Sequence, residues 1–160
     1  SEFCIKKTGK IDLTDIGLAE EDIRRTSQIY IVACGSAYHV GMVAQYVIED
    51  LVKIPVRVEL ASEFRYRKPI LDPNGLVIII SQSGETADSL AALRETKAQG
   101  IRTLGIVNVV GSSIAREADK VFYTLAGPEI SVATTKAYST QLMASYILAI
   151  QFAKVKKYNH

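Results

Sequence analysis

Short apolar runs rich in β-branched residues alternate along the chain with longer segments of helical periodicity. The strands predicted from these runs are residues 29–33, 56–60, 76–80, 103–107 and 121–125. The predicted helices are residues 35–51, 86–99, 113–118 and 134–154. Strands that alternate with helices form right-handed crossovers, which give a parallel sheet with helices on both faces. The pattern therefore predicts a doubly wound α/β fold.

Three segments refine this picture. Residues 56–60 alternate between apolar and charged side chains, which predicts a half-buried or edge strand. The stretch 69–75 contains two prolines, an asparagine and a glycine, and predicts a turn-rich connection. The last helix, 134–154, is apolar nearly all round, so it is predicted to be buried or docked against a partner. We therefore expect a homodimer or a larger assembly.

Length and composition fit one ordinary globular domain. The chain has 160 residues, 48% hydrophobic and 22% charged, and a chain of this size buries roughly 70% of its unfolded surface. We assign residues 28–154 to the domain and 155–160 to a C-terminal tail. Residues 1–27 form an N-terminal extension, whose first three residues are interpreted as a cloning scar because they match nothing that follows.

Charge and cysteine content exclude several classes of protein. A net charge of +2 argues against a nucleic-acid platform, and the cluster of Arg65, Arg67 and Lys68 is interpreted as a solvated turn. No segment is long and apolar enough to cross a bilayer of about 30 Å. The two cysteines, Cys4 and Cys34, form neither a disulfide framework nor a metal site, so we expect no metal, no cofactor and a cytoplasmic location. Cys34 is predicted to be a small buried residue.

The most informative stretch is the central apolar strand and the polar turn that follows it. Five apolar residues, 76–80, lead into Ser81, Gln82 and Ser83, then a glycine, and Thr86 opens a helical pattern. Backbone N–H groups at a helix N-terminus have no intrahelical partner and carry partial positive charge. With added hydroxyl and amide donors, such a turn suits a phosphate. A capped strand–helix turn that binds nothing remains the alternative, because Ser and Thr are ordinary cap residues.

Two further polar loops are expected at the same edge of the sheet, where ligands of doubly wound proteins bind. Gly35 permits close approach of the backbone to a ligand, and Ser36 offers a hydroxyl. The loop 129–135 brings Thr134 as a cap and a partner for sugar hydroxyls. No G-x-G-x-x-G fingerprint and no Walker lysine is present, which argues against dinucleotides and nucleoside triphosphates.

Three charged or titratable residues near these loops are predicted to be structural. Lys136 falls in the first turn of the last helix, which favours a structural or ion-pairing role over imine chemistry. His39 lies just inside the first long helix and is interpreted as a packed or capping residue. Glu85 would oppose an anionic ligand, so it is expected to face a helix N-terminus or a partner.

These residues, taken together, resemble the first sugar isomerase (SIS) domain of the glutamine–fructose-6-phosphate aminotransferases, also called glucosamine-6-phosphate synthases. The matching motifs are residues 33–38 (ACGSAY), 58–67 (VELASEFRYR), 81–88 (SQSGETAD), 108–113 (NVVGSS) and 129–137 (EISVATTKA). The motif at 81–86 is shared by many SIS proteins. The Ala-Ser-Glu-Phe-Arg-Tyr-Arg and Val-Ala-Thr-Thr-Lys-Ala stretches are more specific to the synthases.

The resemblance implies a flavodoxin-like sheet of five parallel strands and a hexose 6-phosphate ligand. It assigns the phosphate to Ser81, Gln82, Ser83 and Thr86, and it places Gly35, Ser36, Val132 and Thr134 beside the sugar. It assigns no catalytic residue to this chain. Ala37 departs from the family, which usually has a serine that also touches the phosphate, so one donor is lost and affinity is expected to be lower.

The family also implies parts that this sequence does not contain, namely a glutamine-hydrolysing domain and a second, catalytic SIS repeat. The chain is therefore interpreted as an excised binding half, inactive alone, of an enzyme that makes glucosamine 6-phosphate. Two alternatives stay open. One is a free-standing SIS module that senses a phosphosugar, and the other is a homo-oligomeric phosphosugar isomerase, for which His39, Glu63, Glu85 and Glu129 are the candidate bases.

Overall fold

The computed structural model describes residues 18–124 and 133–157, with the side chains of the last helix described from Tyr138 onward. The strands are β1 (Gln28–Ala33), β2 (Val56–Leu60), β3 (Gly75–Ser81), β4 (Arg102–Val107) and β5 (Lys120–Tyr123). The helices are α1 (Glu20–Arg25), α2 (Ser36–Val52), α3 (Ala61–Arg67), α4 (Ala87–Ala98), α5 (Ser113–Glu117) and α6 (Ala133–Lys157). All neighbouring strands pair in parallel, in the order β2-β1-β3-β4-β5. The predicted doubly wound, five-stranded parallel sheet is confirmed.

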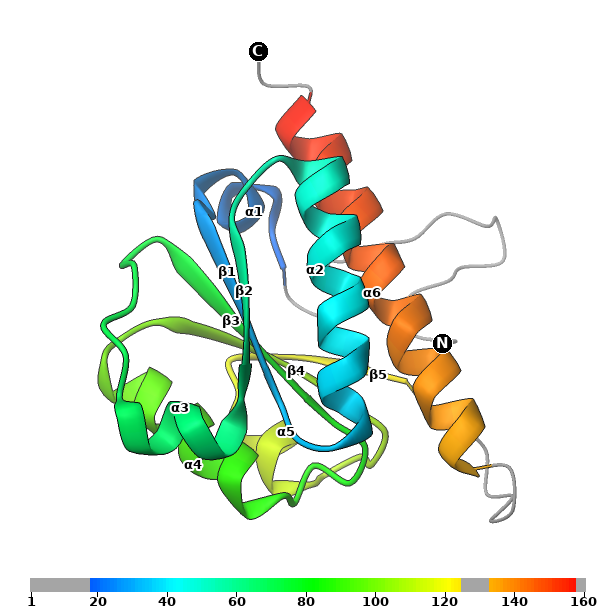
Figure 1. Cartoon of the computed structure of the whole chain (residues 1–160). Coiled ribbons are helices and arrows are strands. Elements are labelled where there is room, and N and C mark those ends of the chain that lie inside the picture. Colours follow the sequence, from blue (N-terminus) through cyan, green and yellow to red (C-terminus); the bar gives the residue numbers. More distant parts are fainter. Residues whose placement is uncertain (1–17, 125–132, 158–160) are drawn as a thin grey trace.

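Helices cover both faces of the sheet (Figure 1). Along β1, Ile29 and Ile31 belong to a core cluster shared with α1, α2 and α6, whereas Tyr30 and Val32 belong to a second cluster shared with α3, α4 and α5. This division follows from the strand geometry, because successive side chains point to opposite faces. Every residue of β3 is buried, as expected for the central strand of a parallel sheet.

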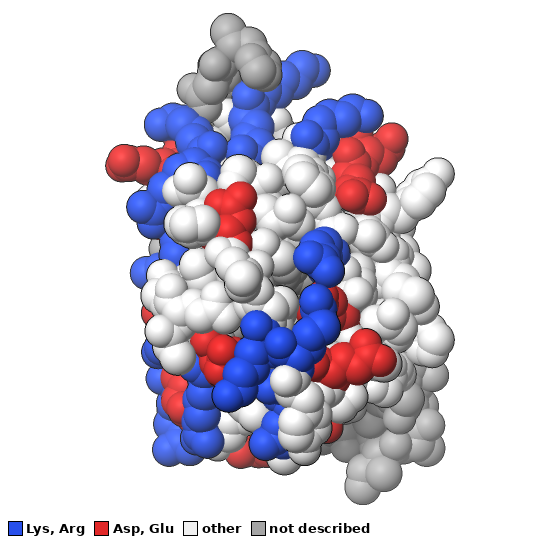
Figure 2. Space-filling model, turned by 60° about the vertical axis from the view of Figure 1, so that its left-hand side comes forward, with Lys and Arg blue, Asp and Glu red and all other residues white. Residues whose placement is uncertain are grey.

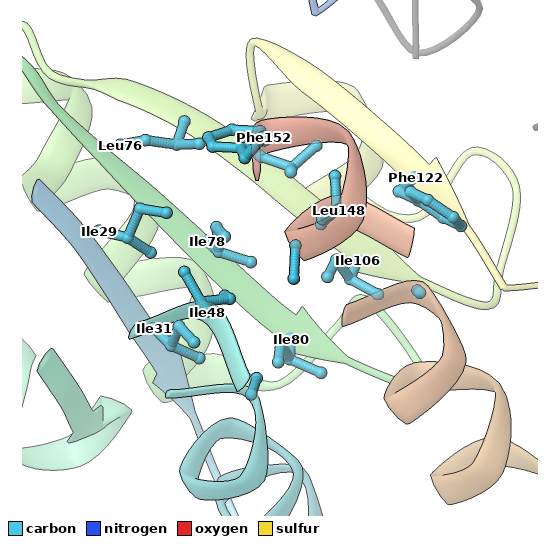
Figure 3. Close-up of a cluster of buried hydrophobic side chains, with 14 of the residues drawn as sticks. Ile29, Ile31, Ile48, Leu76, Ile78, Ile80, Ile106, Phe122, Leu148 and Phe152 are labelled. Carbon is cyan, nitrogen blue, oxygen red and sulfur yellow. The ribbon is translucent and has the colours of Figure 1, made fainter. Parts of the chain in front are cut away.

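The larger core lies between the sheet and the pair α2 and α6. Figure 3 shows Ile48, Leu148 and Phe152 from these helices meeting isoleucines of β1 and β3. Full burial of each such side chain contributes about 1.5–3 kcal/mol. Leu18 and Ile23, from residues that the sequence assigns to the N-terminal extension, are also buried in this cluster.

Helix α3 was not predicted. It begins directly after β2, with no turn residue between them, and it buries Ala61 and Phe64 as one short apolar face. Seven residues carry too little periodicity to show a helix against the strong turn signal at 69–75.

The interpretation of the basic cluster beside α3 as a solvated turn was wrong. Arg65 Nη1 lies 3.0 Å from Asp88 Oδ1 on α4, and Arg67 forms an ion pair with the largely buried Glu59 of β2. Lys68 ends the helix in a left-handed conformation with φ of 47°. Basic and acidic side chains are accordingly interspersed over this side of the molecule (Figure 2).

Smaller differences concern the ends of elements. Strand β5 ends at Tyr123, two residues before the predicted end at position 125. Strand β2 is at the edge of the sheet and largely half-buried, as its alternating pattern predicted. Cys34 is a half-buried free thiol rather than a buried one, because it follows the last residue of β1 and opens into a polar loop.

Candidate functional site

The candidate site lies where the winding of the sheet reverses. Strands β1 and β3 are neighbours in register, Ala33 beside Ile80. The chain leaves β1 for α2 on one face of the sheet and leaves β3 for α4 on the other face. The two departing loops therefore part and leave a crevice at the carboxyl ends of the strands, as in other doubly wound sheets.

A pocket of about 290 Å³ occupies this crevice. Its lining consists of Cys34, Gly35, Ser36, Ala37, Ile80, Ser81, Gln82, Ser83, Thr86, Tyr138 and Gln141. Six residues predicted from the sequence to bind the ligand thus come together, two from the loop after β1 and four from the loop after β3. None of these described lining residues carries a formal charge, so the pocket offers an anion neutral donors only.

The loop after β3 is organised by its own hydroxyl groups. The Ser81 side chain is buried, accepts a hydrogen bond from the Gly84 N–H at 3.1 Å, and lies 3.1 Å from Thr86 Oγ1. Ser83 Oγ accepts a hydrogen bond from the Glu85 N–H at 3.0 Å. Gln82 and Ser83 are exposed. Ser81 therefore shapes the turn, while Gln82 and Ser83 are open to a ligand.

Two helices of twelve and seventeen residues, α4 and α2, begin at the pocket. Neither Thr86 nor Gly35, at the N-cap positions, forms a side-chain cap hydrogen bond. The first N–H groups of both helices carry partial positive charge that favours an anion. Gly35 has φ of +55°, and nothing lies within 4 Å of the Cβ that another residue would add, so its backbone conformation, rather than space, requires glycine.

Glu85 faces away from the pocket lining, as the sequence predicted. Its carboxylate accepts hydrogen bonds from the backbone N–H and the hydroxyl of Ser113 at the start of α5. The hydrogen bonds from Ser113 lower the pKa of Glu85, and the charge of Arg116 adds to this effect. The carboxyl group is thus held ionised but directed to a helix N-terminus.

Other predicted residues lie partly or wholly outside the described region. Val132 is not among the described residues. Thr134 and Lys136 belong to the first turn of α6, where only the backbone is described. His39 is exposed on α2 with its ring 6.3 Å from that of Tyr38, so its predicted role as a packed or capping residue was wrong.

Two lining residues, Tyr138 and Gln141, were missed by the sequence analysis. They lie three positions apart on α6 and therefore on one face of that helix. Gln141 is only 4% exposed. An amide at a buried position of a helix that is apolar nearly all round was a signal in the sequence, since buried polar groups need partners.

Other kinds of site find no support in residues 18–124 and 133–157. No three His, Cys, Asp or Glu side chains are grouped there as metal ligands. No helix in these ranges combines the length and the apolar character needed to cross a membrane.

The fold and this pocket define a class of protein. The chain belongs to the SIS domain family, whose model matches residues 22–151. Among individual proteins, it is 60% identical to the glutamine–fructose-6-phosphate aminotransferase (isomerizing) of Clostridium tetani over 146 residues, which are 91% of this chain and 24% of that protein. The chain spans about a quarter of the length of the curated relatives it matches.

Solved structures of related proteins have the same fold. The C-terminal domain of glucosamine-fructose-6-phosphate aminotransferase from Francisella tularensis superposes with a TM-score of 0.89 and 46% identity, covering 96% of this chain and 44% of that one. Glucosamine-6-phosphate deaminase from Thermotoga maritima superposes with a TM-score of 0.74 and 30% identity, covering 81% of this chain and 40% of that one.

Proposed function

We propose that this chain is the phosphosugar-binding domain of a glutamine-dependent fructose-6-phosphate aminotransferase that makes glucosamine 6-phosphate. The observation that carries the proposal is the uncharged pocket at the reversal of the sheet, where hydroxyl groups, an amide and two helix N-termini converge. The ligand we infer is a hexose 6-phosphate, fructose 6-phosphate or glucose 6-phosphate. The similarity to aminotransferases whose names include fructose 6-phosphate supports this choice.

Within the pocket, we assign the phosphate to Ser81, Gln82, Ser83 and Thr86. Gln82 and Ser83 are exposed and free to turn toward an oxyanion, while Ser81 and Thr86 lie deeper and hold the turn. Gly35 and Ser36 line the other side of the pocket, at the β1–α2 connection, where the sugar would extend. We propose that Val132 and Thr134 complete that side. Ala37 is buried in the lining and offers no donor.

Calorimetric titration with fructose 6-phosphate tests the assignment. Loss of a hydrogen bond to a charged group costs about 1.5–3 kcal/mol, so Ser83→Ala should weaken binding at least about tenfold. Ser27→Ala is the matched control, because Ser27 precedes β1 at the opposite edge of the sheet and bonds Asp72. Equal affinities for Ser83→Ala and the wild type would contradict the assignment. Ala37→Ser should bind more tightly than the wild type.

We also propose that the chain alone does not catalyse the reaction. Isomerisation of a ketose needs a group that moves a proton between adjacent carbons, and the described lining offers hydroxyl, amide and thiol groups but no carboxylate or imidazole. Incubation with fructose 6-phosphate and ammonium should therefore yield neither glucose 6-phosphate nor glucosamine 6-phosphate. Turnover that disappears in Glu85→Gln or Lys136→Ala would instead favour a self-contained isomerase.

Association through the surface of α2 and α6 is part of the proposal. Ten large hydrophobic side chains are exposed in the described residues, and six of them belong to these two helices: Met42, Tyr46, Leu51, Met143, Tyr146 and Ile150. We call this set the α2–α6 surface. The two helices pack side by side. Leu51 and Ile150 line one shared depression, and Met42 and Tyr46 line another that Tyr138 of α6 borders. We propose that this set is an interface, because exposed apolar side chains gathered on neighbouring helices often mark one. We propose a homodimer or larger assembly, in the cytoplasm, where the free Cys34 thiol would stay reduced.

A further inference from the structure

The loop that we assign to the phosphate is fastened to a second loop, residues 108–112 between β4 and α5. The Asn108 N–H donates to the Gln82 carbonyl at 3.1 Å, and the Ile114 N–H donates to the Gly84 carbonyl at 2.9 Å. Glu85 then bonds Ser113 through both carboxylate oxygens, at 2.8 Å to the N–H and 2.5 Å to the hydroxyl. Within residues 82–85, three of the four residues are thus hydrogen-bonded to residues 108–114, which lead into α5 and form its start.

The N-terminus of α5 is capped from outside its own segment. Ser112 occupies the N-cap position and is a favoured cap residue, yet its side chain forms no cap hydrogen bond. Its hydroxyl is buried and has no hydrogen-bond partner among the described residues. Glu85 caps α5 instead, because its carboxylate accepts a hydrogen bond from the Ser113 N–H. The residue that caps α5 therefore belongs to the phosphate loop.

The Ser112 side chain is turned inward against Gly84. A Cβ at Gly84 would lie 2.1 Å from Ser112 Oγ, and Gly84 has φ of +71°, so both space and backbone conformation exclude a larger residue there. The close contact and the cap act on adjacent residues, Gly84 and Glu85. Together they fix the turn immediately before Thr86 and α4.

We propose that Glu85 is a positioning residue, which holds the phosphate loop in its binding conformation by capping α5 and makes ligand affinity depend on its own ionisation. The inference rests on the proposed function, because it concerns the same loop. The Glu85 carboxylate is bonded to Ser113, outside the described pocket lining and away from the expected place of the ligand. It acts through the backbone of Gly84 and Thr86, its neighbours on either side.

The charges around Glu85 determine the direction of the pH dependence. Arg116 on α5 attracts the carboxylate and Glu117 on α5 repels it, while Asp88 on α4 is paired with Arg65. The pKa of Glu85 is lowered from 4.5, chiefly by Ser113. A carboxylate with a lowered pKa keeps its interaction above its ordinary pKa and loses it as the pH falls through the lowered value. We call the two hydrogen bonds between Glu85 and Ser113 the clamp. The clamp should therefore persist at pH 5–7 and open only below pH 4.5.

The experiment compares Glu85→Gln with the wild type, using the full chain and fructose 6-phosphate in calorimetric titrations from pH 3.5 to 7.5. The ratio of the two dissociation constants cancels the ionisation of the ligand's own phosphate, whose second pKa is about 6. We expect Glu85→Gln to bind at least about threefold more weakly at pH 7. The ratio should fall toward one as the pH drops below 4.5 and passes through the lowered pKa of Glu85, where the wild-type carboxyl group becomes protonated.

Glu117→Gln is the matched control. The pKa of Glu117 is also lowered, by its hydrogen bond to Arg94, but this pair joins α5 to α4 and does not touch the phosphate loop. The affinity of Glu117→Gln should equal that of the wild type at pH 7, and because Glu117 repels Glu85, its low-pH fall should come at a lower pH than in the wild type. A ratio of one for Glu85→Gln at pH 7, or a ratio that stays constant over a pH range in which the Glu85 carboxyl group is seen to titrate in the folded protein, would overturn the proposal.

Amide hydrogen exchange of the unliganded chain separates this proposal from the proposed function. If the wild type binds no fructose 6-phosphate, the proposed function is contradicted. The exchange rates then test by themselves whether the Glu85–Ser113 hydrogen bonds hold the loop. Loss of the clamp should speed exchange at Gly84 and Ser113 at least about threefold in Glu85→Gln, with no change in Glu117→Gln. Unchanged exchange at both amides in Glu85→Gln would overturn the clamp.

Discussion

The two layers of helices are held to the sheet in different ways. On one face, α2 and α6 are 17 and 25 residues long and pack through a continuous apolar cluster. The described residues show no ion pair between these two helices. On the other face, α3 and α5 have seven and five residues, and polar contacts tie them to their neighbours. These contacts are Arg65 with Asp88, Arg94 with Glu117, and Glu85 with Ser113.

The difference indicates that the two helix layers have different roles. The long helices pack mainly through apolar area, with a few polar contacts from Gln45 and Glu49 to the Val56 backbone of β2, and their outer surface also carries exposed apolar side chains. The short helices α3 and α5 bury few side chains, and an isolated helix below about 12 residues is marginal in water, so their polar contacts add to a small packing contribution. Their polar contacts fix the loops between elements, and one of these loops lines the pocket. The long helices supply most of the apolar burial and carry the proposed association surface, and the short helices fix the loop that lines the pocket.

Phe152→Ala should show the largest effect on folding, because it removes a nearly fully buried ring from the apolar layer. Loss of a core phenylalanine costs about 3–5 kcal/mol. Denaturant unfolding measures the change, with Ile150→Ala on the exposed side of the same helix as the control. A loss for Phe152→Ala no larger than that of the control would show that packing does not hold this layer.

Asp119→Ala tests the polar layer. Asp119 Oδ2 accepts hydrogen bonds from the N–H and the hydroxyl of the buried Thr103, each at 2.9 Å, and so ties the turn after α5 to β4. We expect a loss of about 1–3 kcal/mol, clearly less than for Phe152→Ala. Asp50→Ala, whose partner Lys53 lies 3.9 Å away on the surface, should change the free energy of unfolding by less than about 0.5 kcal/mol. Similar losses for both aspartates would contradict a specific role of Asp119.

The exposed ion pair between Arg94 and Glu117 should matter least for stability in the polar layer. Both N–O distances are near 3 Å, but the side chains are largely exposed and solvent screens them. Arg94→Ala should lower the melting temperature by no more than about 2 °C. The pKa of Glu117 is lowered by Arg94, so the small stabilisation should be present above pH 4.5 and disappear as the pH falls below it. The difference in melting temperature between the wild type and Arg94→Ala should therefore be smaller at pH 3.5 than at pH 7.

Substitution on the α2–α6 surface should leave folding almost unchanged while abolishing association. Tyr46 is 79% exposed and Met143 is 57% exposed, so Tyr46→Glu with Met143→Glu should alter the stability of the monomer by no more than about 0.5 kcal/mol each. Analytical ultracentrifugation at micromolar concentration should give a mass near 17.5 kDa for the double variant and a larger mass for the wild type. Tyr66→Glu, on α3, is equally exposed and serves as the control, which should assemble as the wild type does.

The sequence predicted the apolar layer better than the polar one. The strand 76–80 was visible as an unbroken apolar run, and α2 was visible from the helical spacing of its apolar residues. Helix α3 was missed because two buried residues, Ala61 and Phe64, are too few to show a period. In the pocket, the two loops could be placed from the strands that precede them. The approach of Tyr138 and Gln141 to these loops could not be placed, because it depends on how α6 crosses the sheet; the amide of Gln141 in an apolar helix marked it as unusual but did not show where it lies.

The position of Tyr138 has a thermodynamic consequence. Its side chain lines the pocket and also borders the apolar depression formed by His39, Met42, Val43 and Tyr46 on the outer surface. A neighbouring subunit that restricts this ring alters the free energy of filling the pocket. Binding free energies are reciprocal, so a bound ligand must then change subunit affinity by the same factor. If the proposed assembly forms over this depression, Tyr138 would therefore couple ligand binding in the pocket to subunit association.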